Sequence, residues 1–132
     1  MSLTHKKYIF IVDDDEINNF ICTSLLVEVF KDYEVISNTN PIKAFDQVKE
    51  HHLDILFILL DINMPQMDGW EFLEKCNLEN LIKFPIFMLT SSISNQDHEK
   101  SQKETTIKGF IHKPLSILNL DEIQNTINTF YV

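Results

Sequence analysis

Several polar side chains in this sequence follow short apolar runs, and their types suit the binding of metal and phosphate. Asp13, Asp14 and Asp15 come directly after the apolar run at 8–12, and a glutamate comes next. Like charges about 5 Å apart repel by roughly 3 kcal/mol at an effective dielectric constant of about 20. Three adjacent carboxylates therefore need a nearby cation, or they point in different directions. Later apolar runs end in other reactive side chains, namely Asp61, Thr90 and Lys113.

Taken together, these side chains favour phosphoryl chemistry. Clustered carboxylates supply the oxygen ligands that Mg²⁺ prefers, and Mn²⁺ accepts the same ligands. The hydroxyl of Thr90 and the ammonium of Lys113 suit a phosphoryl group. Each residue has a simpler role when it is taken alone: Asp15 would cap the next helix, Thr90 would sit in a turn, and Lys113 would be a solvated charge. Only their joint occurrence at the ends of apolar runs indicates a shared site.

The elements that must position these residues alternate along the chain. Short apolar runs predict five strands, at 8–12, 33–37, 54–60, 84–89 and 108–112. A helix is expected after each strand. Strands that alternate with helices form right-handed βαβ units, which build a parallel sheet between two layers of helices. We therefore predict an α/β fold with a parallel sheet. We take the flavodoxin-like form of that fold, a (βα)5 three-layer sandwich with a five-stranded parallel sheet of order 2-1-3-4-5.

This strand order brings the polar residues together. In open α/β sheets, ligands bind at the carboxyl ends of the strands, beside the point where the strand order reverses. The first and third strands are neighbours in the predicted order, so the acids that follow Val12 and Leu60 share one pocket. Thr90 and Lys113 follow the next two strands and are expected at the same edge of the sheet.

Two of the predicted helices matter most for function. The first follows Asp15, and its apolar residues recur every four positions, which predicts a buried face. That face consists of Ile17, Ile21, Leu25 and Val29, with Phe20 beside them. The fourth helix, at 94–104, is polar throughout, so it has few apolar anchors and the low local stability of a bistable output element. The other three helices are expected to turn apolar residues inward: Ala44, Phe45 and Val48 on the second helix, Phe72, Leu73 and Cys76 on the third, and Leu120, Ile123, Ile127 and Phe130 on the last.

Composition and charge argue against several classes of protein. A chain of 132 residues, 44% of them apolar and 23% charged, fits one globular domain. The net charge of −9 argues against direct binding of nucleic acid. No apolar run reaches transmembrane length and no hydrophobic signal region begins the chain, so we expect a cytoplasmic protein without membrane insertion. Gly69 and Gly109 are the only glycines, so a Gly-rich phosphate loop is unavailable. Cys22 and Cys76 are expected as buried, reduced thiols.

The chain resembles the receiver domain of a two-component response regulator, of the single-domain, chemotaxis-regulator type, over nearly all of its 132 residues. The motifs are the acidic pair Asp13-Asp14, "LLDINMPQMDGWEFL" around Asp61, "MLTSS" with Thr90, and "GFIHKPL" with Lys113. Their order, their placement at strand ends and the string D-x-x-M-P-x-M-D-G form a specific signal.

The resemblance implies a phosphoacceptor and a metal site. Asp61 would accept a phosphoryl group from the phosphohistidine of a sensor histidine kinase or a histidine phosphotransfer protein, and the same site would slowly hydrolyse the acyl phosphate. Mg²⁺ or Mn²⁺ would be held by the carboxylates of Asp14 and Asp61 and by the backbone carbonyl of Asn63. Asp13 would act on the metal through water.

The resemblance also implies a switch. Lys113 would pair with one phosphoryl oxygen, and the hydroxyl of Thr90 would hydrogen-bond another. Movement of Thr90 toward the phosphoryl group would let Phe110, on the fifth strand, move into the space that it leaves. Many family members carry Tyr at that position, so the switch here would depend on packing and shape. It would act through the face formed by the fourth helix, the fifth strand and the last helix, on an unknown downstream protein.

Further residues follow from the same resemblance. Asn63 and Ser92 flank the phosphoryl site and would tune the lifetime of the acyl phosphate. The Lys113-Pro114 bond resembles the cis peptide bond of the family. The segment "KETTIKG" before the fifth strand departs from the Ala-Gly-Ala-like turn that is frequent in the family. We expect residues 1–132 to form a single receiver domain, with no output domain in this chain.

Two alternatives remain open from the sequence. The string "VDDDEI" is similar to the nucleophile motif of haloacid-dehalogenase-like phosphatases, with Asp13 as nucleophile and Asp15 as acid–base. Against it, no acidic pair follows a later strand, and the string around Asp61 would be unexplained. The other alternative is a degenerate receiver that binds a partner without phosphorylation, against which the complete set of site residues argues.

Overall fold

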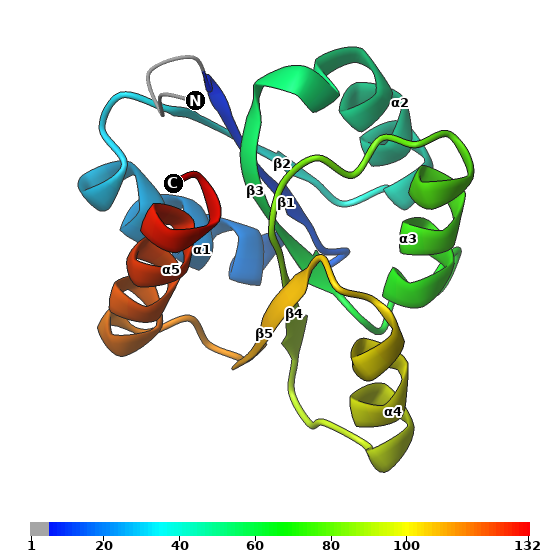
Figure 1. Ribbon diagram of the computed structural model, residues 1–132. Coiled ribbons are helices and arrows are strands. Elements are labelled where there is room, and N and C mark those ends of the chain that lie inside the picture. Colours follow the sequence, from blue (N-terminus) through cyan, green and yellow to red (C-terminus); the bar gives the residue numbers. More distant parts are fainter. Residues whose placement is uncertain (1–5) are drawn as a thin grey trace.

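The computed structural model describes residues 6–132, which form a sheet of five parallel strands with helices on both faces (Figure 1). The strands lie in the order β2-β1-β3-β4-β5, so the predicted α/β fold and strand order are confirmed. Their bounds are β1 (Tyr8–Val12), β2 (Glu34–Asn38), β3 (Ile55–Asp61), β4 (Ile86–Thr90) and β5 (Ile107–His112). Each predicted strand is present, with ends that differ from the prediction by at most two residues.

Helices cover both faces of the sheet. They are α1 (Glu16–Val29), α2 (Pro41–His51), α3 (Gly69–Leu78), α4 (Asn95–Lys103) and α5 (Ile117–Phe130), and a short 3₁₀ helix, η2 (His52–Asp54), follows α2. Figure 1 shows α1 and α5 on one side and α2, α3 and α4 on the other. Polar side chains begin the helices: Asp15 caps α1 and Asn40 caps α2, while Asp68, Ser94 and Ser116 form capping boxes at α3, α4 and α5.

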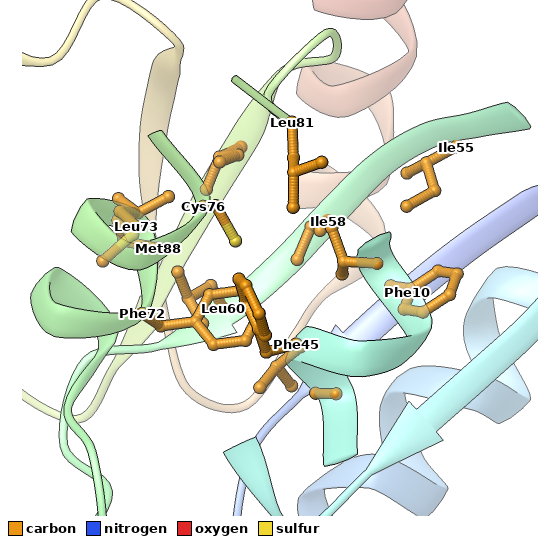
Figure 2. Close-up of a cluster of buried hydrophobic side chains, with 14 of the residues drawn as sticks. Phe10, Phe45, Ile55, Ile58, Leu60, Phe72, Leu73, Cys76, Leu81 and Met88 are labelled. Carbon is orange, nitrogen blue, oxygen red and sulfur yellow. The ribbon is translucent and has the colours of Figure 1, made fainter. Parts of the chain in front are cut away.

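The apolar core lies in two layers, one on each face of the sheet. The layer under α2 and α3 includes Phe10, Phe45, Leu60, Phe72 and Met88 (Figure 2). The layer under α1 and α5 includes Ile11, Cys22, Leu26, Phe57 and Ile123. Each fully buried Phe or Leu contributes about 1.5–3 kcal/mol relative to an exposed side chain. β3 is buried along its whole length, as a central strand between two helix layers must be. Cys22 and Cys76 are buried and free, as predicted.

The predicted buried face of α1 is wrong in part: Ile21 and Leu25 are half-buried, and Leu25 packs on the core, but the other three residues are exposed. Ile17 and Phe20 are each 73% exposed, and Val29 is exposed as well. The buried residues of α1 are Asn18, Asn19, Cys22 and Leu26. The apolar periodicity misleads because the first turn of α1 turns two amides inward, where they bond to Asp13.

Helix α4 is present as predicted, and polar contacts attach it to the rest of the domain. None of its residues is buried. The indole N–H of Trp70, on α3, donates to Asp97 Oδ1 at 3.0 Å. Two turns further along α3, Asn77 Nδ2 donates to Glu104 Oε2 at 2.7 Å. Because α4 buries no residue and a single hydrogen bond adds only about 1 kcal/mol of net stability, α4 is weakly held.

None of the helices among residues 6–132 is long and apolar enough to cross a membrane.

Candidate functional site

The candidate site lies at the carboxyl ends of four neighbouring strands. Asp13 follows β1, Asp61 and Thr90 are the last residues of β3 and β4, and Lys113 follows β5. Backbone hydrogen bonds tie these strand ends to their neighbours in the sheet, β2 included. The N–H of Asp13 donates to Asn38 O at 3.1 Å, and the N–H of Lys113 donates to Thr90 O at 2.9 Å. The parallel sheet therefore brings together residues that lie 100 positions apart in the sequence.

Three carboxylates converge at this edge. Oxygen atoms of Asp13, Asp14 and Asp61 lie within 4.8 Å of one another. Asp13 and Asp61 are 0% and 2% exposed, whereas Asp14 is exposed. Carboxylate oxygens at such separations suit a hard divalent cation that keeps water on its open side. The donor set thus fits Mg²⁺ or Mn²⁺.

Lys113 lies between the two buried carboxylates. Its Nζ is 2.8 Å from Asp13 Oδ2 and 3.3 Å from Asp61 Oδ1. With the three carboxylates ionised, the single ammonium leaves two negative charges uncompensated. One divalent cation would balance them. The peptide bond from Lys113 to Pro114 is cis.

The electrostatics of this cluster shift two pKa values. Burial, followed by the negative charge of Asp13, raises the pKa of Asp61 from 3.8 to about 7, against the opposing effect of Lys113. Burial alone would lower the pKa of Lys113. The hydrogen bond to Asp13 and the charges of both acids outweigh burial, so the pKa of Lys113 is raised. The metal-free site therefore disfavours a full set of negative charges.

Two residues that the sequence analysis missed bind Asp13. Asn18 Nδ2 donates to Asp13 Oδ2 at 2.7 Å, and Asn19 Nδ2 donates to the Asp13 carbonyl oxygen at 2.9 Å. Each asparagine is 5% exposed. Asp15 N–H donates to Asp13 Oδ1 at 3.0 Å, so both carboxylate oxygens of Asp13 have protein donors. The sequence offered one signal for them. Two adjacent asparagines stand in the first helical turn after the acids, where their amides can reach back to Asp13.

Thr90 is buried, and its hydroxyl is bound to the following loop. Thr90 Oγ1 donates to Ser92 O at 2.6 Å and accepts from Ser92 N–H at 3.1 Å. Ser92 itself is exposed. Thr90 and Ser92, both predicted to flank a phosphoryl group, therefore form one hydrogen-bonded turn at the end of β4.

The loop after β3 packs closely on Asp61. Asn63 is exposed, and its N–H donates to Asp61 Oδ1 at 3.3 Å. Gly69 begins α3, and its N–H donates to Ile62 O at 2.8 Å. A Cβ on Gly69 would lie 2.6 Å from the Asp61 carbonyl oxygen, closer than any side chain tolerates. Glycine is required here because α3 begins against the backbone of Asp61.

Phe110 lies outside the carboxylate cluster, on β5. It is half-buried, and its ring centroid is 5.4 Å from that of His98 on α4, edge to face. A hollow of about 580 Å³ lies between α3 and α4, also away from the carboxylates, and its lining includes Trp70, Asn77 and Lys100. Its lining mixes acidic residues and lysines and contains none of the site residues. The strand ends are therefore the better candidate site.

Comparisons with known proteins show which family and fold this chain is similar to. The family model described as "Response regulator receiver domain" matches residues 9–127. The polar-differentiation response regulator DivK of Brucella ovis is 30% identical over 112 residues, which cover 84% of this chain and 87% of that protein. A two-component response regulator from Cytophaga hutchinsonii superposes with a TM-score of 0.81 at 25% identity, covering 94% of this chain and 98% of that one.

A complex of CheX and CheY with BeF3 and Mg²⁺ from Borrelia burgdorferi also matches. Its TM-score is 0.73 at 21% identity, over 92% of this chain and 89% of that chain. At this identity the match supports the fold alone.

Proposed function

This chain belongs to the response regulator receiver domain family of two-component signalling, and we propose that it accepts a phosphoryl group on Asp61. The donor would be the phosphohistidine of a sensor histidine kinase or a histidine phosphotransfer protein. The Asp61 carboxylate would attack phosphorus, the phosphorus–nitrogen bond to histidine would break, and an acyl phosphate would form. The family is a signalling domain and not a typical enzyme; later attack of water on the acyl phosphate would release inorganic phosphate.

The observation that supports this proposal is the pairing of Lys113 with Asp13 and Asp61 beside three convergent carboxylates. Phosphoryl transfer needs little covalent chemistry from the protein, and its catalysis is mostly positioning and charge neutralisation. An ammonium 3.3 Å from Asp61 Oδ1 is placed to contact a phosphoryl oxygen bonded to that carboxylate. Pairing with a phosphoryl oxygen is the role that we assign to Lys113.

Mg²⁺ or Mn²⁺ would be bound by Asp14, Asp61 and the backbone carbonyl of Asn63, with Asp13 acting through water. The bound cation would neutralise charge on the transferring phosphoryl group. Asp14 is assigned as a direct ligand and Asp13 as an indirect one because both carboxylate oxygens of Asp13 already accept protein hydrogen bonds. Asp14 is exposed and is therefore the better direct ligand.

The hydroxyl of Thr90 would donate a hydrogen bond to another phosphoryl oxygen. To do so, the hydroxyl must give up its hydrogen bond to Ser92 O. Asn63 donates its N–H to Asp61, and Ser92 is hydrogen-bonded to Thr90, so both flank the proposed phosphoryl site and would tune the lifetime of the acyl phosphate. Movement of Thr90 would be followed by Phe110, whose ring now contacts His98 of α4. Because α4 is attached mainly by polar contacts, displacing Phe110 would change the α4, β5 and α5 face, which would control a protein partner.

Exposed apolar side chains near the site would receive the phosphohistidine partner. Ile17 and Phe20 are exposed in the first turns of α1, and Ile117 and Leu118 are exposed at the start of α5. Both helices begin just after the strands that deliver Asp13 and Lys113. Exposed apolar side chains that flank a reactive site suit the docking of a partner helix. This surface supports transfer from a protein donor.

The test is chemical trapping of the phosphorylated residue. The protein is incubated with Mg²⁺ and acetyl phosphate, reduced with borohydride and mapped by mass spectrometry, with Asp61→Asn as the control. Label at Asp61, absent from the control, is the expected result. Label at Asp13 would support the phosphatase alternative, and no label at either residue would support a degenerate receiver.

A further inference from the structure

We propose that Asn18 is a positioning residue that allows Lys113 to leave Asp13 and reach a phosphoryl group on Asp61. This inference rests on the proposed function. Asn18 lies in the first turn of α1, one turn after the acidic pair, and it does not contact Asp61 through any of its described hydrogen bonds. Its effect would be exerted through Asp13.

The geometry shows two donors on one oxygen. Asp13 Oδ2 accepts from Lys113 Nζ at 2.8 Å and from Asn18 Nδ2 at 2.7 Å. Lys113 is 0.5 Å further from Asp61 Oδ1, at 3.3 Å. In this structure the ammonium is thus held more closely by Asp13 than by Asp61. A phosphoryl group on Asp61 would have to draw the ammonium away from Asp13.

Drawing the ammonium away has a cost that Asn18 reduces. A buried carboxylate oxygen that loses its only donor is destabilised by about 1–3 kcal/mol or more, because water cannot replace the donor. Asp13 is 0% exposed, so apart from the metal-bound water through which it would act, solvent does not reach its side chain. The amide of Asn18 remains on Oδ2 when Lys113 departs. Because the amide is neutral, it keeps Asp13 hydrogen-bonded without adding a charge that would compete with Lys113.

The position of Asn18 is itself well determined. Its backbone N–H donates to Asp15 Oδ1 at 3.2 Å, which ties the residue to the cap of α1. Its side chain is 5% exposed, so few other rotamers are available. A donor that is held in place loses little entropy when it remains alone on Oδ2.

Asn19 provides a matched control. It is also 5% exposed and also donates from Nδ2 to Asp13, at 2.9 Å, but to the backbone carbonyl oxygen. Replacing either asparagine with alanine removes one buried hydrogen bond to the same residue. Only Asn18→Ala removes a donor from the carboxylate that Lys113 must leave.

The experiment compares the wild type, Asn18→Ala and Asn19→Ala in three measurements. Calorimetry gives the dissociation constant of Mg²⁺ alone and that of beryllofluoride, a phosphoryl mimic, at saturating Mg²⁺; urea unfolding gives stability. We expect Asn18→Ala to weaken beryllofluoride binding about tenfold, the value of one charge-assisted hydrogen bond, and to change Mg²⁺ binding by less than about twofold. Asn19→Ala is expected to lose comparable stability but to bind beryllofluoride within about twofold of the wild type.

Two results would overturn the proposal. One is that Asn18→Ala binds beryllofluoride as tightly as the wild type. The other is that the two variants lose beryllofluoride affinity equally, since an equal loss would mean that both residues only brace Asp13. If Asn18→Ala does not fold, Asn18→Leu, which fills the site without a donor, is measured against the same criteria. A wild type that binds no beryllofluoride and is not labelled at Asp61 would instead refute the proposed function.

Discussion

Replacing Lys113 with methionine tests the electrostatic account of the site. The change retains much of the volume of the side chain but removes the only cation that contacts Asp13 and Asp61 among the described ion pairs. At distances of 2.8 and 3.3 Å the two attractions amount to about 6 and about 5 kcal/mol for an effective dielectric constant of about 20. Desolvation of the ammonium offsets much of this. Breaking a buried pair typically costs about 3–5 kcal/mol. We expect Lys113→Met to lower the free energy of unfolding by about 3 kcal/mol at pH 8 without Mg²⁺.

The loss should depend on pH and on metal. Because the pKa of Asp61 is about 7, this carboxyl is largely protonated at a pH near 5.5, and the cluster then has one charge fewer to neutralise. The loss at the lower pH should therefore be smaller. Mg²⁺ should restore part of the stability at pH 8, because it binds the folded state and replaces the missing positive charge.

Urea unfolding at the two pH values, with and without Mg²⁺, measures these effects. Lys83→Met is the control because Lys83 is exposed, and its stability should stay within about 0.5 kcal/mol of the wild type. A loss below about 1 kcal/mol for Lys113→Met at pH 8 without metal would refute the reasoning, since the pair would then contribute no more than an exposed ion pair. An equal loss at both pH values would refute the part assigned to Asp61.

Three further predictions concern other parts of the domain. Asp61 has a pKa of about 7 in the folded state, against 3.8 for an unperturbed aspartate, so between these pH values the folded state binds the proton more tightly than the unfolded state. The metal-free wild type should therefore lose stability as the pH rises toward about 7. Asp61→Asn should lack that slope in urea unfolding, and parallel profiles would contradict the raised pKa. Gly69→Ala should lower stability by about 1–3 kcal/mol in calorimetry, because its Cβ would lie 2.6 Å from a carbonyl oxygen. Gly109→Ala, whose Cβ would meet its nearest atom at 3.6 Å, should be tolerated better; equal losses would argue against the clash. Trp70→Phe should speed hydrogen exchange in α4 but not in α3, because it removes the donor to Asp97; unchanged exchange in α4 would show that this bond does not hold the helix.

Much of the fold was predictable because its signals are local. The apolar run that became β3 is long enough and apolar enough to indicate a strand buried on both faces, and β3 is buried throughout. Asp15 caps α1 as expected, since capping depends on backbone groups two or three residues away. The face of α1 was mispredicted in part. The spacing of Ile17 and its apolar neighbours shows that they share one face of the helix, but it does not show whether that face packs on the sheet.

The sequence by itself determined which residues reach the edge of the sheet. Asp61, Thr90 and Lys113 end or follow strands, and parallel strands necessarily place their carboxyl ends at one edge. Tertiary structure alone decided which donor serves which acceptor there. Asn18 serves the Asp13 carboxylate and Asn19 its carbonyl, and the ammonium lies nearer Asp13 than Asp61. Such pairings depend on differences of a few tenths of an ångström between segments that are distant in the sequence, which spacing along the chain cannot specify.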